Sequence, residues 1–166
     1  IAQREGFGKI LAEGSQKASE IIGRGTEDYL ITSKGQEAPA HMPQVKRSLS
    51  VIYAANPFGA DHESSEHDPS YKAYPERMEQ IGLTNPQEKL ALNEEIMRFA
   101  MVTQHLSSAV DSLSVCAFIF GASFQLYDAD QLVEVVNAVT GWDTDITEIL
   151  AVGERRLNML LSLIHI

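Results

Sequence analysis

The apolar residues between positions 90 and 113 recur at intervals of three and four, and this spacing limits the fold more than any other feature of the chain. Side chains at that spacing share one face of an α-helix, so the stretch predicts a helix with a buried stripe. We expect it to begin at Asn85, with a proline in its first turn, and to run to about Gly121. Its last third, Val115 to Phe120, is apolar on every side and is therefore expected to be buried.

Shorter helices are expected on both sides of the Gly14-Ser15 pair, with Ser15 as an N-cap. Others are expected over residues 48–55 and 130–139, and from about residue 144 onward. Residues 29–32 are the best candidate for a strand, and the polar run 61–75 predicts a surface loop. The expected class is all-α: an irregular helical bundle with at most one short strand. We divide it into a helix and loop segment with pocket residues (1–84) and a helical segment carrying the cysteine (85–166).

Charge and cysteine content restrict the partners and the compartment. The 166 residues include 23 acidic and 13 basic side chains, a net charge of −10, which argues against nucleic acid or an anionic membrane as partner. No apolar run reaches the length of a membrane span. A single cysteine rules out an intrachain disulfide and suits a reducing, cytoplasmic location. The chain starts at Ile1 and ends in an apolar run, so we expect it to be part of a larger multi-domain protein.

Few residues suggest chemistry by themselves. Asp111 lies five residues before Cys116; the thiol is either a metal ligand or, as for most free cysteines, a small buried apolar group. His62 and His67 share an acidic loop that either binds a divalent metal or is simply solvated. Glycine-rich phosphate loops and the GxSxG motif of serine hydrolases are absent. The residues alone leave the reaction open.

Four stretches resemble one family when they are taken in order. They read KGQEAPAH at 34–41, YAANPFGADH at 53–62, DSLSVC at 111–116, and AVTGW at 138–142 followed by GERRLN at 153–158. Together they are similar to the C-terminal helical part of the tungsten-containing aldehyde ferredoxin oxidoreductases. The resemblance extends from about residue 13 to about residue 160.

The resemblance implies roles for five residues. Asp111 would hydrogen-bond a tungstopterin cofactor, and Cys116 would supply the fourth thiolate of a [4Fe–4S] cluster whose other three cysteines lie upstream in the family. His62 would give or take a proton while an aldehyde is oxidised. Lys34 and Glu37 match the entry to the same cofactor-binding region, where they would shape the pocket. The tungsten itself would be held by the pterin, so no protein ligand for it is expected.

The implied function is oxidation of an aldehyde to a carboxylate, with ferredoxin as electron acceptor and a possible homo-oligomer as the full-length state. This chain alone is expected to be inactive. Two departures leave the substrate open: positions 41–44 read HMPQ where many members read HDPR, and positions 58–59 read FG where they read RG. The alternatives are a reductase of carboxylates or activated aromatic acids from the same superfamily, and a non-catalytic helical interaction module.

Overall fold

The computed structural model describes residues 2–164, and this part of the chain is mostly helical. The all-α class is confirmed, with a single two-stranded hairpin among the described residues. The helices are α1 (Phe7–Leu11), α2 (Ser15–Ile22), the 3₁₀ helix η1 (Thr26–Tyr29), α3 (Ser48–Ala55), α4 (Asp68–Ala73), α5 (Pro75–Gln80), α6 (Glu94–Ser112), α7 (Ala129–Thr140) and α8 (Ile146–Ile164). Strands β1 (Thr32–Ser33) and β2 (Gln36–Glu37) pair antiparallel.

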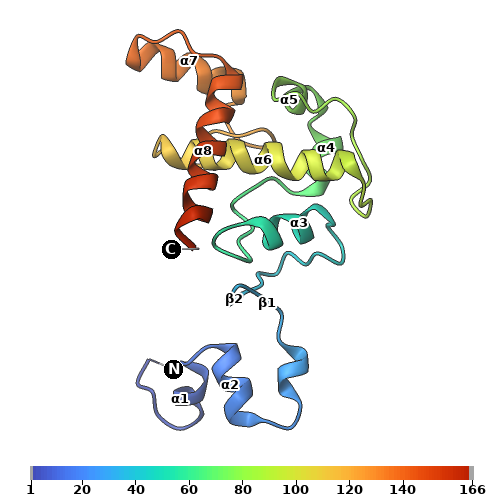
Figure 1. Cartoon of the computed structure of the whole chain (residues 1–166), viewed down its shortest axis with the longest axis vertical. Coiled ribbons are helices and arrows are strands. Elements are labelled where there is room, and N and C mark those ends of the chain that lie inside the picture. The colour runs from blue at the N-terminus through green and yellow to red at the C-terminus, as the bar shows by residue number, and fades with distance from the viewer. Residues whose placement is uncertain (1, 165–166) are drawn as a thin grey trace.

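The core is organised around α6, which α8 crosses (Figure 1). Gly153 of α8 lies directly on the backbone of α6: a Cβ at this position would be 1.8 Å from the carbonyl oxygen of His105. Buried residues of α6 then meet α4, α5 and α7, and Tyr71 stacks on Phe99 with ring centroids 5.0 Å apart. Glycine therefore permits a backbone-to-backbone approach at the centre of the fold.

A second, smaller core joins α3 to α6 and confirms the helix expected over residues 48–55. Leu49, Ile52 and Tyr53 are buried against Ala100 of α6. Because α3 is held by α6, the turns at both of its ends have fixed positions. Those turns carry the histidines described below.

The long helix is shorter than expected at both ends. It begins at Glu94, where the Asn93 side chain accepts a hydrogen bond from the N–H of Ile96, and Asn85 lies in an earlier turn. It ends at Ser112, and Ser114 has a positive φ of 56°, which breaks the helix. The expected burial of residues 115–120 is wrong: they form turns, and Phe118 is 61% exposed.

Two other expectations need correction. The strand expected over 29–32 overlaps the structure only at Thr32, since Tyr29 ends η1 and the two residues between η1 and β1 have no regular structure. The surface loop expected over 61–75 contains α4, which has Pro69 in its first turn, and α5 then begins at Pro75. Ser15 is the first residue of α2, and Gly14 occupies the N-cap position. The helices expected over 130–139 and from about residue 144 are confirmed as α7 and α8.

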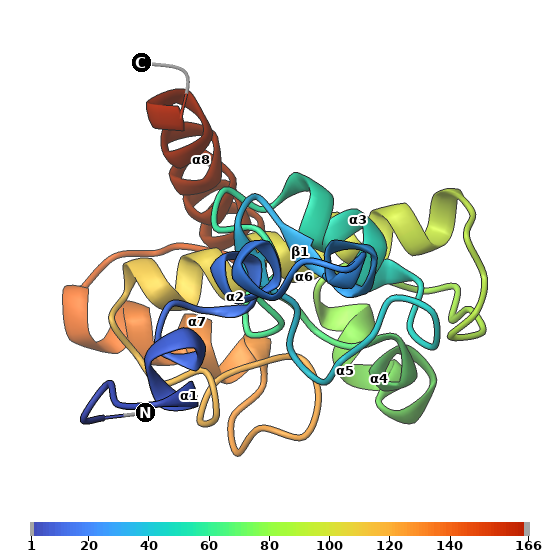
Figure 2. The ribbon, with the colours of Figure 1, turned by 90° about the horizontal axis from the view of Figure 1, so that it is seen from below.

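The N-terminal helices α1, α2 and η1 lie apart from the main bundle and are joined to it through the β1–β2 hairpin (Figure 1). Their apolar residues are largely exposed, among them Phe7, Leu11, Ile21 and Ile22. At the other end of the chain, α8 projects beyond the bundle (Figure 2). Within residues 2–164, no helix combines the length and the apolar character that a membrane crossing requires.

Candidate active site

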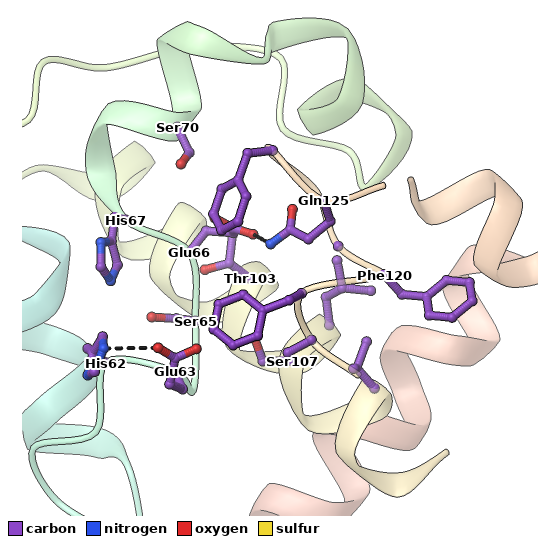
Figure 3. Close-up of a pocket in the computed structure, with 16 residues that line it drawn as sticks. His62, Glu63, Ser65, Glu66, His67, Ser70, Thr103, Ser107, Phe120 and Gln125 are labelled. Atoms are coloured by element: carbon purple, nitrogen blue, oxygen red, sulfur yellow. Dashed lines mark hydrogen bonds and ion pairs between the residues drawn. The ribbon is translucent and has the colours of Figure 1, made fainter. Parts of the chain in front are cut away.

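A pocket of about 110 Å³ lies where the loop before α4 meets α6 and the segment that follows α6 (Figure 3). Its polar side carries His62, Glu63, Ser65, Glu66 and His67. Its apolar side consists of α6 residues and three phenylalanines: Leu106, Val110, Phe118, Phe120 and Phe124. A small molecule with a polar group at one end and a hydrocarbon body would match this division.

The buried hydroxyl of Ser65 has no hydrogen-bond partner, although Ser65 lines the pocket. A buried hydroxyl without a partner costs roughly 1–3 kcal/mol. A polar group of a bound molecule, or a water, would relieve that cost.

Glu66 connects the two walls of the pocket. Its carboxylate accepts hydrogen bonds from the Ser123 hydroxyl at 2.7 Å and from the Gln125 side-chain N–H at 2.9 Å. The Arg77 guanidinium donates to the backbone carbonyls of both Ser123 and Gln125, at 2.7 Å each. The segment after α6 is therefore tied to the acidic loop although it has little regular structure.

Three histidines gather beside the polar side of the pocket. The rings of His41 and His67 lie 4.3 Å apart between centroids, those of His41 and His62 4.6 Å, and those of His62 and His67 5.9 Å. His41 comes from the turn before α3, and the Tyr53 hydroxyl of α3 donates to its carbonyl at 2.8 Å. We call these three rings the histidine cluster.

Lys46 lies within the histidine cluster. Its Nζ is 2.9 Å from Nδ1 of His41 and 2.9 Å from Nδ1 of His67. His62 has a different neighbour, since its Nε2 lies 2.9 Å from a carboxylate oxygen of Glu63. Across the residues with described positions, no group of three or more His, Cys, Asp or Glu side chains could hold a metal ion.

The electrostatics of the cluster favour uncharged rings at two of its positions. Burial, followed by the charge of Lys46, lowers the pKa of His67 from 6.5 to about 4. The same two causes lower the pKa of His41. Burial also lowers the pKa of Lys46, while the carboxylate of Asp68 opposes that shift. Both histidines are thus neutral near pH 7.

Asp111 and Cys116 are both exposed at the end of α6 and in the segment that follows it. Asp111 is at the end of α6, and its side chain is 56% exposed; a carboxylate oxygen lies 3.2 Å from the Arg156 guanidinium of α8. Cys116 is exposed, and the residues that follow it, from Ala117 onward, form part of the pocket wall. The thiol is not sealed in a core remote from His62.

Lys34 and Glu37 lie at the hairpin and do not line the pocket beside His62. The Lys34 ammonium donates to the carbonyls of Ala54 and Asn56, the latter at 2.8 Å, at the end of α3. Glu37 accepts a hydrogen bond from the N–H of Ser15 at 2.6 Å and so caps the start of α2. In this structure both side chains hold the hairpin against neighbouring helices.

Gly59 fixes the turn that leads to His62. Its φ is +80°, and a Cβ there would lie 2.1 Å from the Ser33 carbonyl oxygen of β1. No side chain fits this approach without displacing the hairpin. The small-residue stretch quoted for the resemblance therefore has a definite structural purpose.

Sequence reasoning did not identify Lys46 as a site residue and gave His41 no role, and it considered His67 only as a metal ligand or a solvated residue of the acidic loop. His41 and Lys46 lie in the segment before α3 and His67 lies just before α4, so the three positions have no regular spacing. Only a periodic pattern could have predicted from the sequence that these residues meet, and irregular segments have no such pattern. The juxtaposition arises from packing of the turns around α3.

One family of known proteins matches nearly the whole chain. The family model described as "Aldehyde ferredoxin oxidoreductase, domains 2 & 3" matches residues 1–160. The chain belongs to the aldehyde ferredoxin oxidoreductase family. It is 33% identical over 159 residues to the tungsten-containing aldehyde ferredoxin oxidoreductase of Pyrococcus abyssi, and 31% identical to that of Pyrococcus furiosus. The corresponding protein of Thermococcus kodakarensis is 30% identical.

These alignments cover 95% of the chain but only 24% of each relative. The chain thus spans about a quarter of the length of the aldehyde ferredoxin oxidoreductases that it matches. The resemblance inferred from four short stretches is confirmed along nearly the whole sequence.

Proposed function

We propose that this chain is part of a tungsten enzyme, and that the complete enzyme oxidises aldehydes to carboxylates and passes the electrons to ferredoxin. The names of its relatives supply the reaction class. One observation of the structure supports it most: the segment that carries the exposed Cys116 thiol continues directly into the wall of the pocket beside His62. An electron acceptor bound to that thiol would be next to the substrate.

The residues present fit part of each cofactor. A [4Fe–4S] cluster takes four thiolates, and Cys116 offers one that is accessible. The carboxylate of Asp111 is exposed and can accept hydrogen bonds from the N–H groups of a pterin. When bound, the tungstopterin would accept two electrons from the aldehyde, and the cluster would carry them onward one at a time.

The remaining roles belong to side chains of this chain. His62 is proposed to hold or release the proton, because it lines the pocket and its Nε2 lies 2.9 Å from a carboxylate oxygen of Glu63. The three phenylalanines would surround the hydrocarbon part of the aldehyde and exclude water. Lys34 and Glu37 are proposed to act indirectly, by holding the hairpin that supports the turn before His62.

The test uses the enzyme that contains this chain, purified without oxygen. We expect tungsten or molybdenum together with iron in elemental analysis, and aldehyde-dependent reduction of ferredoxin. Cys116→Ser should lower the iron content and abolish electron transfer, whereas Ser112→Ala, a matched change near the same helix end, should leave both intact. A wild-type protein without tungsten, molybdenum or iron would refute the proposal.

Assays on the same purified enzyme distinguish the proposed oxidation reaction from the alternative, a reductase. If the protein holds both cofactors but consumes reduced ferredoxin only with carboxylates or activated aromatic acids, the cofactor assignment stands and the direction of the reaction is wrong. A protein free of cofactors and inert toward both substrate classes would instead favour a helical interaction module.

A further inference from the structure

Two rings of the histidine cluster, His41 and His67, have Lys46 as their neighbour, whereas the third, His62, has Glu63. We propose that Lys46 is a positioning residue, which fixes His41 and His67 in the tautomer that carries its proton on Nε2 and so leaves His62 to take up a proton. The tautomer assignment is independent of the reaction, but its purpose rests on the proposed function. Lys46 does not line the pocket, so it acts through the rings.

The hydrogen-bond chemistry of the ammonium group determines the tautomers. A charged lysine has three N–H donors and no acceptor. With Nζ at 2.9 Å from Nδ1 of both His41 and His67, each Nδ1 must be the acceptor. A neutral imidazole that accepts at Nδ1 carries its proton on Nε2. A protonated ring would place an N–H against the ammonium, which repels it.

The surrounding charges distinguish His62 from the other two. His41 and His67 face Lys46 and each other. The charges of Lys46 and His62 lower the pKa of both rings, whereas the charge of Glu63 raises the pKa of His41. Lys46 in turn is influenced by the carboxylate of Asp68 and, in the opposite sense, by the charge of Lys89.

Among residues 2–164 the Lys46 ammonium is hydrogen-bonded to His41 and His67 and not to His62, whose Nε2 lies beside Glu63. A proton entering the cluster therefore meets a cation at two rings and an anion at the third. This arrangement directs the proton to His62, which lines the pocket together with His67 but is not hydrogen-bonded to Lys46 as His67 is.

The direct test is nitrogen NMR of the whole chain labelled in its histidines. Long-range proton–nitrogen correlations at pH 7.5 report the tautomer of each ring, and single His→Gln variants assign the signals. We expect Nε2–H at both His41 and His67. Nδ1–H at either ring in the wild type would overturn the proposal, and this measurement needs no variant at Lys46.

Lys46→Met then tests the cause. We expect mixed tautomers at His41 and His67, and midpoints of protonation higher by about one pH unit, since a neighbouring cation has been removed. Lys46→Arg should retain most of the wild-type pattern. The matched control is Lys89→Met, which removes a nearby cation that does not contact the rings. Unchanged tautomers and midpoints in Lys46→Met would refute the role.

The outcome is separable from that of the proposed function. If the NMR pattern is as expected but the complete enzyme contains no cofactor, the positioning role holds and the proposed reaction fails. In the active enzyme, Lys46→Met should displace the pH profile of kcat more than it changes KM. A loss of activity at all pH values equally would show a merely structural role.

Discussion

The buried carboxylate of Asp68 accepts hydrogen bonds from the backbone N–H of Ser48, at 2.8 Å, and from the Ser48 hydroxyl. Both residues are almost completely inaccessible to water. Ser48 begins α3 and Asp68 begins α4, so this contact joins two helix starts. A negative charge in the first turn of α3 is favourable because the helix presents unpaired N–H groups there. The contact also brings His67 to the turn that carries Lys46.

Asp68→Asn should destabilise the chain by about 2 kcal/mol, because an amide replaces a buried charged acceptor that receives two hydrogen bonds. Urea unfolding followed by circular dichroism measures the change. Asp143→Asn, at an exposed position, is the matched control and should change the free energy of unfolding by less than about 0.5 kcal/mol. Equal effects of the two substitutions would contradict the importance of the buried contact.

Stability should fall as the pH is lowered from about 6.5 to about 4, because the pKa of His67 is lowered to about 4 in the folded chain. In that interval the unfolded chain binds a proton at His67 that the folded chain does not bind, so acid favours unfolding. The loss is on the order of 3 kcal/mol at its largest. Above the unfolded pKa the contribution is constant.

His67→Gln tests this assignment by removing the titrating ring while keeping a side chain that can accept from Lys46. The slope of unfolding free energy against pH between 4 and 6.5 should flatten in this variant. A slope that matches wild type would assign the acid sensitivity to other groups. His105→Gln is a useful comparison, since burial also lowers the pKa of His105 at a position outside the cluster.

Gly153→Ala should be among the most destabilising changes in the chain. The added methyl would lie 1.8 Å from the His105 carbonyl oxygen and 3.0 Å from the backbone nitrogen of Ala109, so the two helices must separate. We expect a loss of about 2–3 kcal/mol, as is typical of overpacking. Gly141→Ala is the informative comparison: its φ of 75° strains an alanine, but no neighbouring atom would be struck. A Gly153→Ala protein as stable as wild type would show that the crossing can move.

The Cys116 thiol should react rapidly with a thiol reagent in the chain alone, since it is exposed. In the complete enzyme the same thiol should be protected, because a cluster ligand is not free to react. Reaction with Ellman's reagent, with Cys116→Ser as the blank, measures both states. Equally fast reaction in the iron-loaded enzyme would show that Cys116 is not a ligand.

Much of the fold was predictable where the signals are local. The helix over 48–55 was correct to the residue, and α7 ends at Gly141 as expected because its left-handed φ suits glycine. The start of α6 was wrong, because Asn85 and Asn93 both offer a capping side chain and only tertiary contacts choose between them. The expected burial of residues 115–120 was wrong for a related reason. Apolar composition predicts burial, but Ser114 turns the chain out of the helix.

The candidate site likewise contains residues that a local sequence pattern indicates and residues that only tertiary packing brings together. His62 was identified through its place in a short motif, and the structure puts it at the pocket. Lys46 contacts two rings that are 5 and 21 positions away in the sequence, so no local pattern indicates it. Roles that depend on the meeting of separate turns are visible only once the helices have been packed.

The Glu66 contacts described above have a mechanical consequence. Ser123 and Gln125 are anchored on the acidic loop, and the only thiol of the chain lies seven residues before the first of them. The intervening segment is short, contributes Phe118 and Phe120 to the pocket, and is held at its far end by these hydrogen bonds. If Cys116 binds a cluster as proposed, both ends of this segment would be held, and a displacement of the sulfur would move the two aromatic rings that line the proposed substrate site.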